Sequence, residues 1–116
     1  MTTEIFQDDL TDIFIKYDIN KEKKQVEIID FKYDDKDIKI FLKLLKESID
    51  KLLNDGHKKF IQITTFFDWN TYIKKDKRWK FVSTHNIYNI KIECDLDCAT
   101  ECVAQGFGIF ENHTEY

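Results

Sequence analysis

The sequence of 116 residues contains no proline, only three glycines and a single arginine. Three glycines are too few for the usual glycine-rich loops that hold phosphate groups. No apolar run approaches the ~18 residues that a membrane-spanning helix requires, so we expect no membrane association. Residues 1–10 lack a basic region followed by an apolar core, and they therefore carry no recognisable secretory signal.

Cysteine is scarce as well, and the three cysteines form no C-x-x-C pair. An odd number argues against a disulfide framework and favours a reducing, cytoplasmic setting. Cys94, Cys98 and Cys102 follow one another at steps of four, which differs from the known spacings of iron–sulfur and zinc ligands. We interpret them as small buried apolar residues, and the sequence predicts neither a metal nor a cofactor.

Lysine, isoleucine and phenylalanine are abundant, with 17, 16 and 10 residues. These residues have A/T-rich codons, whereas proline, alanine and glycine have G/C-rich ones, so the bias indicates an A/T-rich genome. The lysine excess then carries little functional meaning. The net charge of −4 argues against sequence-independent binding of the whole molecule to nucleic acid.

Residues 35–55 are predicted to form one long amphipathic helix. Lysines and acidic residues occupy the side opposite the apolar stripe, and Asp34 or Asp35 is expected to cap the first turn. Gly56 can take the left-handed conformation that ends the helix. The stripe is too broad and too short for a coiled coil, so we expect it to cover a sheet. Its members are Ile38, Phe41, Leu42, Leu45, Ile49, Leu52 and Leu53.

Strands are predicted on both sides of this helix. Residues 1–10 are expected to be a loosely held arm, while 11–19 and 25–33 alternate in the manner of a β-hairpin. Residues 60–67 are apolar or threonine on both faces, which is typical of a central strand. In the second hairpin strand, alternation places Glu27, Ile29, Phe31 and Tyr33 opposite Val26, Ile28, Asp30 and Lys32.

The remaining residues give weaker patterns. Residues 68–80 are interpreted as a short helix or an ordered loop, followed by strands near 80–85 and 87–96. A second helix is predicted over 97–105, ended by Gly106. The expected architecture is a two-layer α+β sandwich over residues 11–116, in which a mixed sheet of four to five strands packs against both helices.

A helix over 69–84 would give an alternative order, ββαβαβα. That order is similar to the STAS-type regulatory domains over about residues 12–110, including a final helix that ends in Gly-Phe-Gly. The resemblance implies an α/β fold of that kind. The family's phospho-acceptor turn, which resembles Asp-Ser-Ser-Gly, is replaced here by Phe67-Asp68-Trp69-Asn70, so the phospho-switch is not implied.

No catalytic constellation is visible in the sequence. His57, His85 and His113 are scattered, and the two serines are not in a nucleophile motif. Asp68 follows the central strand, where ligand-binding groups often lie, but it is a good helix cap. Glu93, Asp95 and Asp97 alternate and could share a cation on one face. We prefer to interpret Glu93 and Asp95 as the solvent side of a strand and Asp97 as a helix cap. The sequence therefore does not establish an enzyme, and we favour a protein without enzymatic activity.

The residues with the clearest binding character are basic and aromatic ones in segment 69–80. Its lysines and arginine outweigh one aspartate by four charges, whereas residues 93–116 hold acidic residues and no lysine or arginine. We predict a non-enzymatic protein–protein interaction module, including self-association as a homodimer. A nucleic-acid-binding domain that uses the same segment, and a metal-binding protein or minor enzyme, are the alternatives. The predicted interaction surface comprises Trp69, Tyr72, Lys74, Lys75, Arg78 and Trp79.

Overall fold

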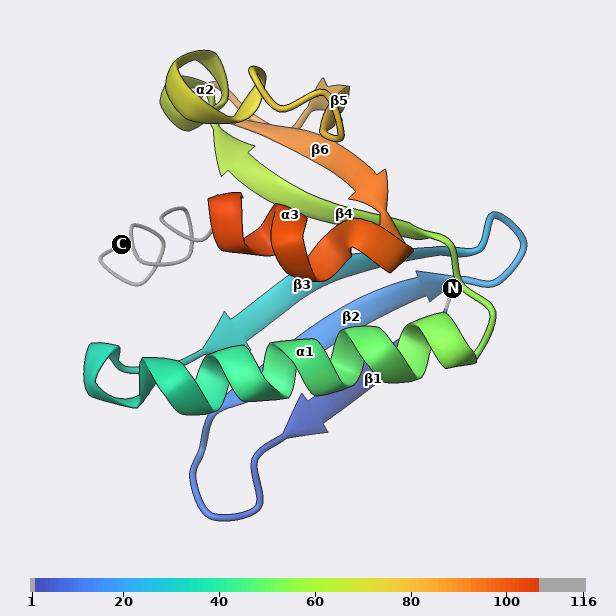
Figure 1. Ribbon diagram of the computed structural model, residues 1–116, viewed down its shortest axis with the longest axis vertical. Coiled ribbons are helices and arrows are strands. Elements are labelled where there is room, and N and C mark those ends of the chain that lie inside the picture. The colour runs from blue at the N-terminus through green and yellow to red at the C-terminus, as the bar shows by residue number, and fades with distance from the viewer. Residues whose placement is uncertain (1, 107–116) are drawn as a thin grey trace.

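The computed structural model describes residues 2–106, which form one mixed sheet with helices packed on it (Figure 1). The predicted α+β class is confirmed, but the sheet has six strands rather than four to five. In chain order the elements are β1 (Thr2–Gln7), β2 (Phe14–Asn20), β3 (Gln25–Lys32), η1 (Asp35–Asp37), α1 (Ile38–Asn54), β4 (Lys59–Thr65), α2 (Phe66–Asp68), η2 (Trp69–Ile73), β5 (Lys80–Thr84), β6 (Asn89–Asp95), η3 (Leu96–Cys98) and α3 (Ala99–Gly106).

The strands lie in the order β1-β2-β3-β4-β6-β5. Neighbours are antiparallel except β3 and β4, which are parallel and are connected through α1. A parallel pair requires such a crossover connection, and here the long helix provides it. The predicted hairpin of β2 and β3 is confirmed by an antiparallel register that runs from Phe14–Lys32 to Asn20–Gln25.

The first strand corrects the prediction of a loosely held arm over residues 1–10. Thr2–Gln7 pairs antiparallel with β2 along its whole length and forms one edge of the sheet. Phe6 packs edge-to-face on Tyr17 at 5.6 Å, and Glu4 accepts an ion-pair hydrogen bond of 2.8 Å from Lys51 of α1. Alternation over so few residues is a weak signal, and it is the contacts with β2 and α1 that hold this strand.

Helix α1 follows the predicted stripe in part, and it begins at Ile38 after a separate 3₁₀ turn and not at residue 35. Leu42 and Leu53 are exposed, whereas Leu44 and Ser48 are buried. Neither Asp34 nor Asp37, the two residues at the cap positions, makes a side-chain cap hydrogen bond, which corrects the predicted capping. Gly56 adopts φ +97° after the last turn, as expected for a left-handed helix end. Six α1 residues are buried against the sheet: Phe41, Leu44, Leu45, Ser48, Ile49 and Leu52.

Helices α1 and α3 lie side by side on the same face of the sheet (Figure 1). Alternate residues of the four inner strands point to this covered face and join one apolar core with both helices. The second helix begins later than predicted, at Ala99, because residues 96–98 form the short turn η3. The core residues from the inner strands are Ile15, Tyr17, Ile19, Val26, Ile28, Phe60, Ile90, Ile92 and Cys94.

A β-bulge in β3 changes which side chains reach this covered face. Tyr17 pairs with Ile28 and Lys16 pairs with Asp30, so Ile29 has no partner on β2. The extra residue shifts the alternation, and Phe31 therefore lies on the same face as Ile28. Phe31 and Tyr33 pack on Phe41 of α1 with ring centroids 5.8 and 4.5 Å apart. Strict alternation along this strand predicts the opposite placement and is wrong beyond Ile28.

The bulge coincides with the place where β3 leaves β4. The two strands pair only at Gln25–Lys59, Val26–Phe60 and Glu27–Ile61. Bulges bend and twist the strand that carries them, and this one lies immediately after the last pair. The C-terminal ends of both strands therefore diverge, and Figure 1 shows them separating from the right of the view to the left.

Residues 66–84 do not form the single helix that the STAS-like alternative requires. A short helical segment, α2 and then the π-helical turn η2, ends at Ile73, and Lys80–Thr84 pairs with β6 as the second edge of the sheet. The resulting strand and helix order excludes the ββαβαβα alternative. No helix within the described residues is long and apolar enough to cross a bilayer.

Candidate functional site

The carboxyl ends of β3 and β4 diverge, and we take this part of the sheet as the candidate site. In open sheets that contain parallel strands, ligands bind beyond the carboxyl ends of the strands, where the connections part. Here β3 leads into α1 and β4 leads into α2, so the connections leave the sheet from adjacent strand ends. Beyond Glu27 and Ile61 the facing edges of the two strands share no ladder hydrogen bonds.

Immediately after the last pair with β3, two polar side chains of β4 lie on the covered face of the sheet. Gln62 is 1% exposed, and neither its amide nitrogen nor its amide oxygen has a hydrogen-bond partner among the described residues. Thr64 is fully buried, and within residues 2–106 its hydroxyl makes only a long contact of 3.5 Å with the carbonyl oxygen of Thr65. A buried amide without partners is costly, and groups of this kind are concentrated at functional sites.

The end of β4 is fixed by a reciprocal cap between Thr65 and Asp68. The Thr65 hydroxyl accepts a hydrogen bond from the Asp68 backbone N–H at 3.0 Å and donates one to the Asp68 carboxylate at 2.7 Å. This arrangement resembles a capping box. The sequence predicts Asp68 as the cap of the segment that begins at Trp69. Asp68 stands at that cap position but makes no side-chain cap hydrogen bond there, and its carboxylate bonds instead to Thr65, the cap of α2.

The start of α1 lies beside the end of β3 and is acidic. Asp34, Asp35 and Asp37 surround the first turn, and residues 33–37 contain no glycine. Helix N-termini attract anions through their unpaired N–H groups. Three carboxylates oppose that attraction by like-charge repulsion, so this turn is a poor place for a diphosphate.

The basic and aromatic segment predicted as an interaction surface does not present its aromatic residues together. Trp79 is 3% exposed and packs on Phe60 with ring centroids 6.5 Å apart. Trp69 packs partly buried against the core, whereas Tyr72 is 62% exposed and contacts Phe67 edge-to-face. Since Trp79 contributes to the core, only one of the three predicted rings offers most of its surface.

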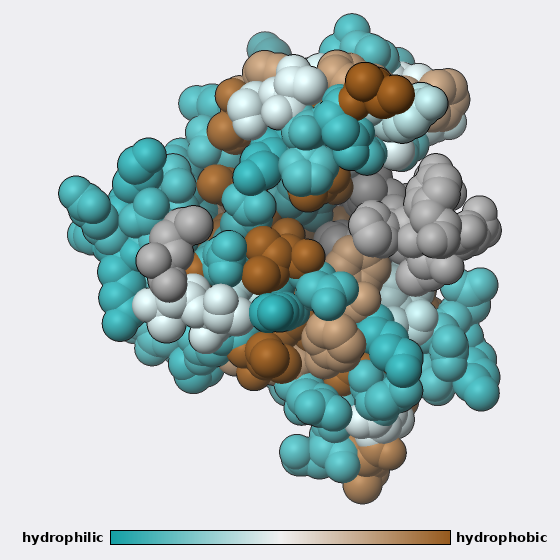
Figure 2. All heavy atoms as spheres, turned by 180° about the vertical axis from the view of Figure 1, so that it is seen from behind, coloured by the Kyte–Doolittle hydropathy of each residue, from teal (hydrophilic) through white to brown (hydrophobic). Residues whose placement is uncertain are grey.

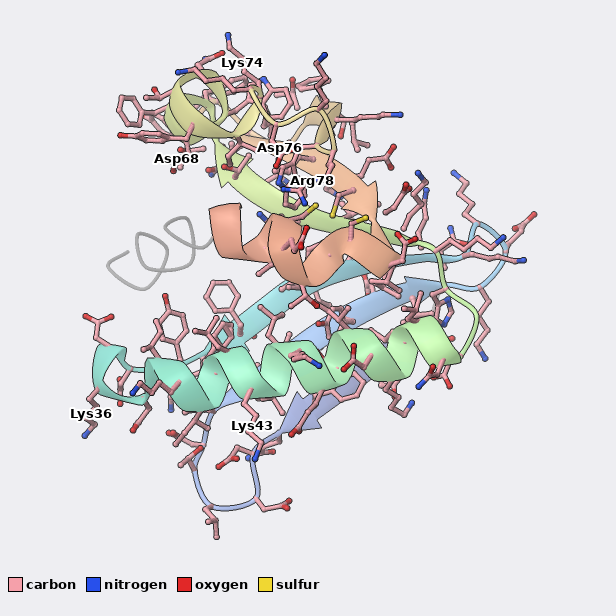
Figure 3. The ribbon with its side chains drawn as sticks, in the orientation of Figure 1. Lys36, Lys43, Asp68, Lys74, Asp76 and Arg78 are labelled. Atoms are coloured by element: carbon pink, nitrogen blue, oxygen red, sulfur yellow. The ribbon has the colours of Figure 1, made fainter. Side chains whose placement is uncertain are left out.

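The charged members of that segment also separate (Figure 3). Lys74 and Lys75 are exposed, and Lys74 points away from the body of the molecule. Arg78 turns inward to Asp76 through hydrogen bonds of 3.0 and 2.7 Å, and it donates a further one of 2.6 Å to Glu101 of α3. Asp76 raises the pKa of Arg78, so its charge is held in a structural ion pair that links the loop to α3.

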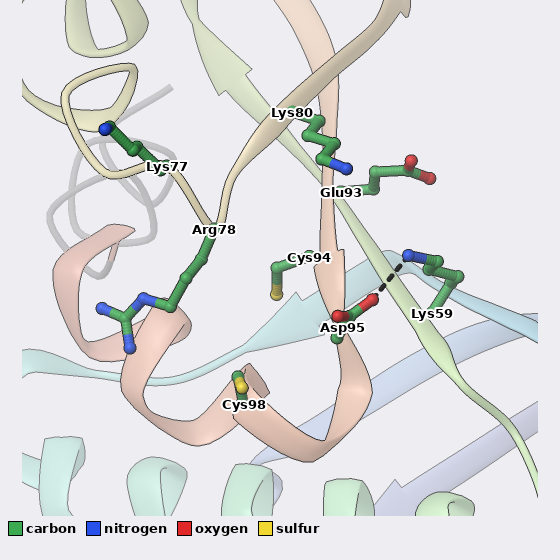
Figure 4. A pocket seen from close by; sticks show the side chains of 8 residues that line it. All are labelled: Lys59, Lys77, Arg78, Lys80, Glu93, Cys94, Asp95 and Cys98. Atoms are coloured by element: carbon green, nitrogen blue, oxygen red, sulfur yellow. Dashed lines mark hydrogen bonds and ion pairs between the residues drawn. The ribbon is translucent and has the colours of Figure 1, made fainter.

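A pocket of about 170 Å³ lies between this loop, the start of β4 and the end of β6 (Figure 4). The cationic groups at its rim do not converge. Lys77 points away, the Arg78 guanidinium is turned to α3, and Lys59 pairs with Asp95 at 2.5 Å. The pocket therefore lacks the clustered positive charge that an anion site needs. Its lining residues are Lys59, Lys77, Arg78, Lys80, Glu93, Cys94, Asp95 and Cys98.

The cysteines in and near this pocket are unsuited to nucleophilic chemistry. Burial raises the pKa of Cys94, and the neighbouring Cys102 thiol raises it further. Burial also raises the pKa of Cys102, and the carboxylate of Asp97 raises that of Cys98. The thiolate is the reactive form, so raised pKa values keep all three groups protonated at neutral pH. Cys94 and Cys102 are buried, as expected, and Cys98 is half-buried.

The other groups considered from the sequence do not assemble. In the part of the chain that the structure describes, no three His, Cys, Asp or Glu side chains lie close enough to hold a metal ion. Asp95 is engaged by Lys59, which lowers the pKa of its carboxyl. His57 is nearly buried at the end of α1, His85 is exposed before β6, and His113 lies outside the described residues.

Comparison with known proteins supports a fold but no family. No family model matches the chain, and no curated protein is similar to it in sequence. A crystal structure from Klebsiella pneumoniae subsp. pneumoniae MGH 78578, described as an acyl-CoA N-acyltransferase, is similar in fold with a TM-score of 0.54 and 13% identity. The match covers 82% of this chain and 73% of that one. A structure of the IAA acetyltransferase from Bacillus cereus ATCC 14579 matches at a TM-score of 0.44 and 12% identity, over 72% and 69%.

This likeness contradicts the prediction of a non-enzymatic interaction module. It does not test segment 69–80 as an interaction surface, which stays a prediction. The sequence contains no motif that would have indicated the likeness, because the fold arises from strand order and from the divergence of two strands. Interaction partners stay a prediction that the fold does not test. The architecture of this chain is similar to that of a protein named for acyl transfer from CoA to nitrogen.

Proposed function

We propose that this chain is an N-acyltransferase that takes an acyl group from a pantetheine-type thioester and transfers it to an amine. The observation that carries the proposal is the divergence of β3 and β4 after Glu27–Ile61, within a fold similar to that of an acyl-CoA N-acyltransferase. It supports a ligand position that the sequence pattern alone does not indicate.

The diverging edges suit the pantetheine arm of such a donor. Residues 28–32 and 62–65 belong to strands whose facing edges are no longer paired with each other. An extended ligand with amide groups can hydrogen-bond to backbone N–H and C=O groups of this kind, as a peptide does when it extends a sheet. Pantetheine is a chain with two amides, and its length and polarity match that mode of binding.

The chemistry requires one bond to form and one to break. The acceptor nitrogen attacks the thioester carbonyl carbon, the new C–N bond forms, and the C–S bond breaks. The departing thiol carries away the proton that the amine loses, so atoms and charges balance. Direct transfer is favoured over an acylated cysteine because the thiols of Cys94, Cys98 and Cys102 all have raised pKa values.

The nucleotide half of CoA fits less well than its pantetheine half. The first turn of α1 is flanked by Asp34, Asp35 and Asp37, and these carboxylates repel a diphosphate. We therefore expect recognition to rest on the arm, so that acetyl-pantetheine serves about as well as acetyl-CoA. A lower salt concentration should weaken the binding of acetyl-CoA, because repulsion is then less screened.

The test is a calorimetric titration of the purified chain with acetyl-CoA and, separately, with acetyl-pantetheine. Transfer is then measured by mass spectrometry of a set of primary amines incubated with each donor. We expect saturable binding of both donors and acylation of at least one amine class. Absence of binding by either donor at millimolar concentration would overturn the proposal. Tight binding of acetyl-CoA without binding of acetyl-pantetheine would overturn the claim that recognition rests on the pantetheine arm.

A further inference from the structure

Gln62 differs from the buried pair of Tyr17 and Ser48 in the hydrogen bonding of its side chain. It is 1% exposed, and neither polar atom of its amide has a hydrogen-bond partner among the described residues. Ser48 and Tyr17, by contrast, are equally buried and bond to each other at 2.7 Å. A leucine of similar size would fill the position of Gln62 without leaving an unpaired amide, so the amide destabilises the fold unless something else binds it.

Gln62 lies at the place in the sheet where β3 and β4 separate. Ile61 forms the last pair with β3, and Gln62 is the next residue along β4. Its backbone pairs with Ile92 on the other side, so only the edge that faces β3 is open. The side chain shares the covered face with Phe60 and Thr64, because alternate residues of a strand point to the same side. The amide thus lies where the two strands begin to part.

We propose that the Gln62 side-chain amide binds the thioester of the acyl donor, with its N–H donating a hydrogen bond to the thioester carbonyl oxygen. This inference rests on the proposed function. The amide is a neutral donor in a site closed to water, where a hydrogen bond to a carbonyl is stronger than at the surface. Negative charge develops on that oxygen when the amine attacks, so the same hydrogen bond strengthens in the transition state.

The test compares Gln62→Leu and Gln62→Met with Ser48→Ala as a matched control. All three variants alter a buried polar side chain, but Ser48 lies on α1, which covers the other half of the face. We expect both Gln62 variants to melt at the wild-type temperature or above and to lose roughly tenfold or more in kcat/KM. Most of the loss should appear in kcat. The Ser48 variant should melt lower and retain wild-type kcat/KM.

A second measurement does not depend on how the variants fold. The side-chain amide resonances of Gln62 in the ¹⁵N-labelled wild-type chain, assigned through bonds, should shift when acetyl-pantetheine is added and stay unchanged with pantetheine. Unshifted resonances on saturation, or Gln62 variants with wild-type kcat/KM, would overturn the assignment while the proposed function stands. Wild-type protein that binds neither donor would overturn both.

Discussion

The covered face of the sheet has two halves, one under α1 and one under α3, and buried polar side chains in these halves differ in whether they have hydrogen-bond partners. Under α1, Tyr17 and Ser48 bond to each other at 2.7 Å, and Ser48 also donates to the Leu45 carbonyl at 2.8 Å. Under α3, the Gln62 amide and the Trp79 indole N–H are buried without partners among the described residues. The comparison teaches that the Tyr17–Ser48 pair under α1 is satisfied by its own contacts, whereas the Gln62 amide under α3 is not. The contrast concerns these side chains, because His57 Nδ1 at the C-terminal end of α1 is also buried without a partner among the described residues.

The largest loss in the free energy of unfolding should come from removing a large core side chain from either half of the covered face. Phe41 of α1 and Phe60 of β4 are both fully buried, and truncation of each to alanine should cost about 3–5 kcal/mol. Urea unfolding checks both values. Phe60→Ala should in addition weaken donor binding, because Phe60 lies two residues before Gln62 on the same face. Equal weakening by Phe41→Ala would break the comparison.

A smaller effect is expected from separating the polar pair under α1. Ser48→Ala leaves the Tyr17 hydroxyl buried without its partner and should cost about 1–3 kcal/mol. Adding Tyr17→Phe should recover part of that loss, since both partners are then removed. Chemical denaturation of the two single variants and the double variant measures the coupling. Additive losses would show that the hydroxyls do not stabilise each other.

Alkaline pH should act through the thiols of the α3 half. Burial raises the pKa of Cys94 in the folded chain above its ordinary value, so the unfolded chain loses the proton first. The unfolded state then binds fewer protons, and stability falls as pH rises above ~8.5, by up to about 1.4 kcal/mol per pH unit for one such thiol. Unfolding under reducing conditions between pH 7 and pH 9.5 measures the slope, which Cys94→Ala should make shallower. An unchanged slope would contradict the burial argument.

The smallest effect concerns the uncovered face, which Figure 2 shows with apolar and hydrophilic residues side by side. Lys91 of β6 reaches across β4 to Glu27 of β3 and forms an ion pair of 3.1 Å at the last pairing point of the two strands. Both side chains are partly exposed, so Lys91→Met should cost about 0.2–1 kcal/mol, and less at high salt. A loss that is independent of salt would assign the effect to packing over Ile61.

Much of the fold could be predicted from local pattern. The stripe of α1, the hairpin of β2 and β3 and the helix end at Gly56 all follow from spacing and from backbone preference. The first strand could not, since Thr2–Gln7 is held by its neighbours rather than by its own pattern. The face to which each β3 side chain points could not be predicted either. Ile28 and Ile29 are both apolar, so the sequence does not indicate which of them is the unpaired residue of the bulge.

The candidate site was hidden for a related reason. Gln62 stands inside the run FIQITTFF, whose apolar character indicates a central strand and draws attention from its one amide. A glutamine between two isoleucines of a buried strand is the signal that could have found it. Trp79 misled in the opposite direction, because its basic neighbours suggest a surface although the ring packs on Phe60. Charge along a chain does not say which way a ring points.

Ile29 links two properties of the molecule that look independent. This one unpaired residue turns Phe31 and Tyr33 to the side of α1, and it stands at the place where β3 departs from β4. We expect that deleting it would turn both rings to the opposite face and allow β3 and β4 to pair further along their length. The exposed side chain at position 29 can therefore change, but shortening the strand by one position would remove both the packing of the two rings on α1 and the separation of β3 from β4.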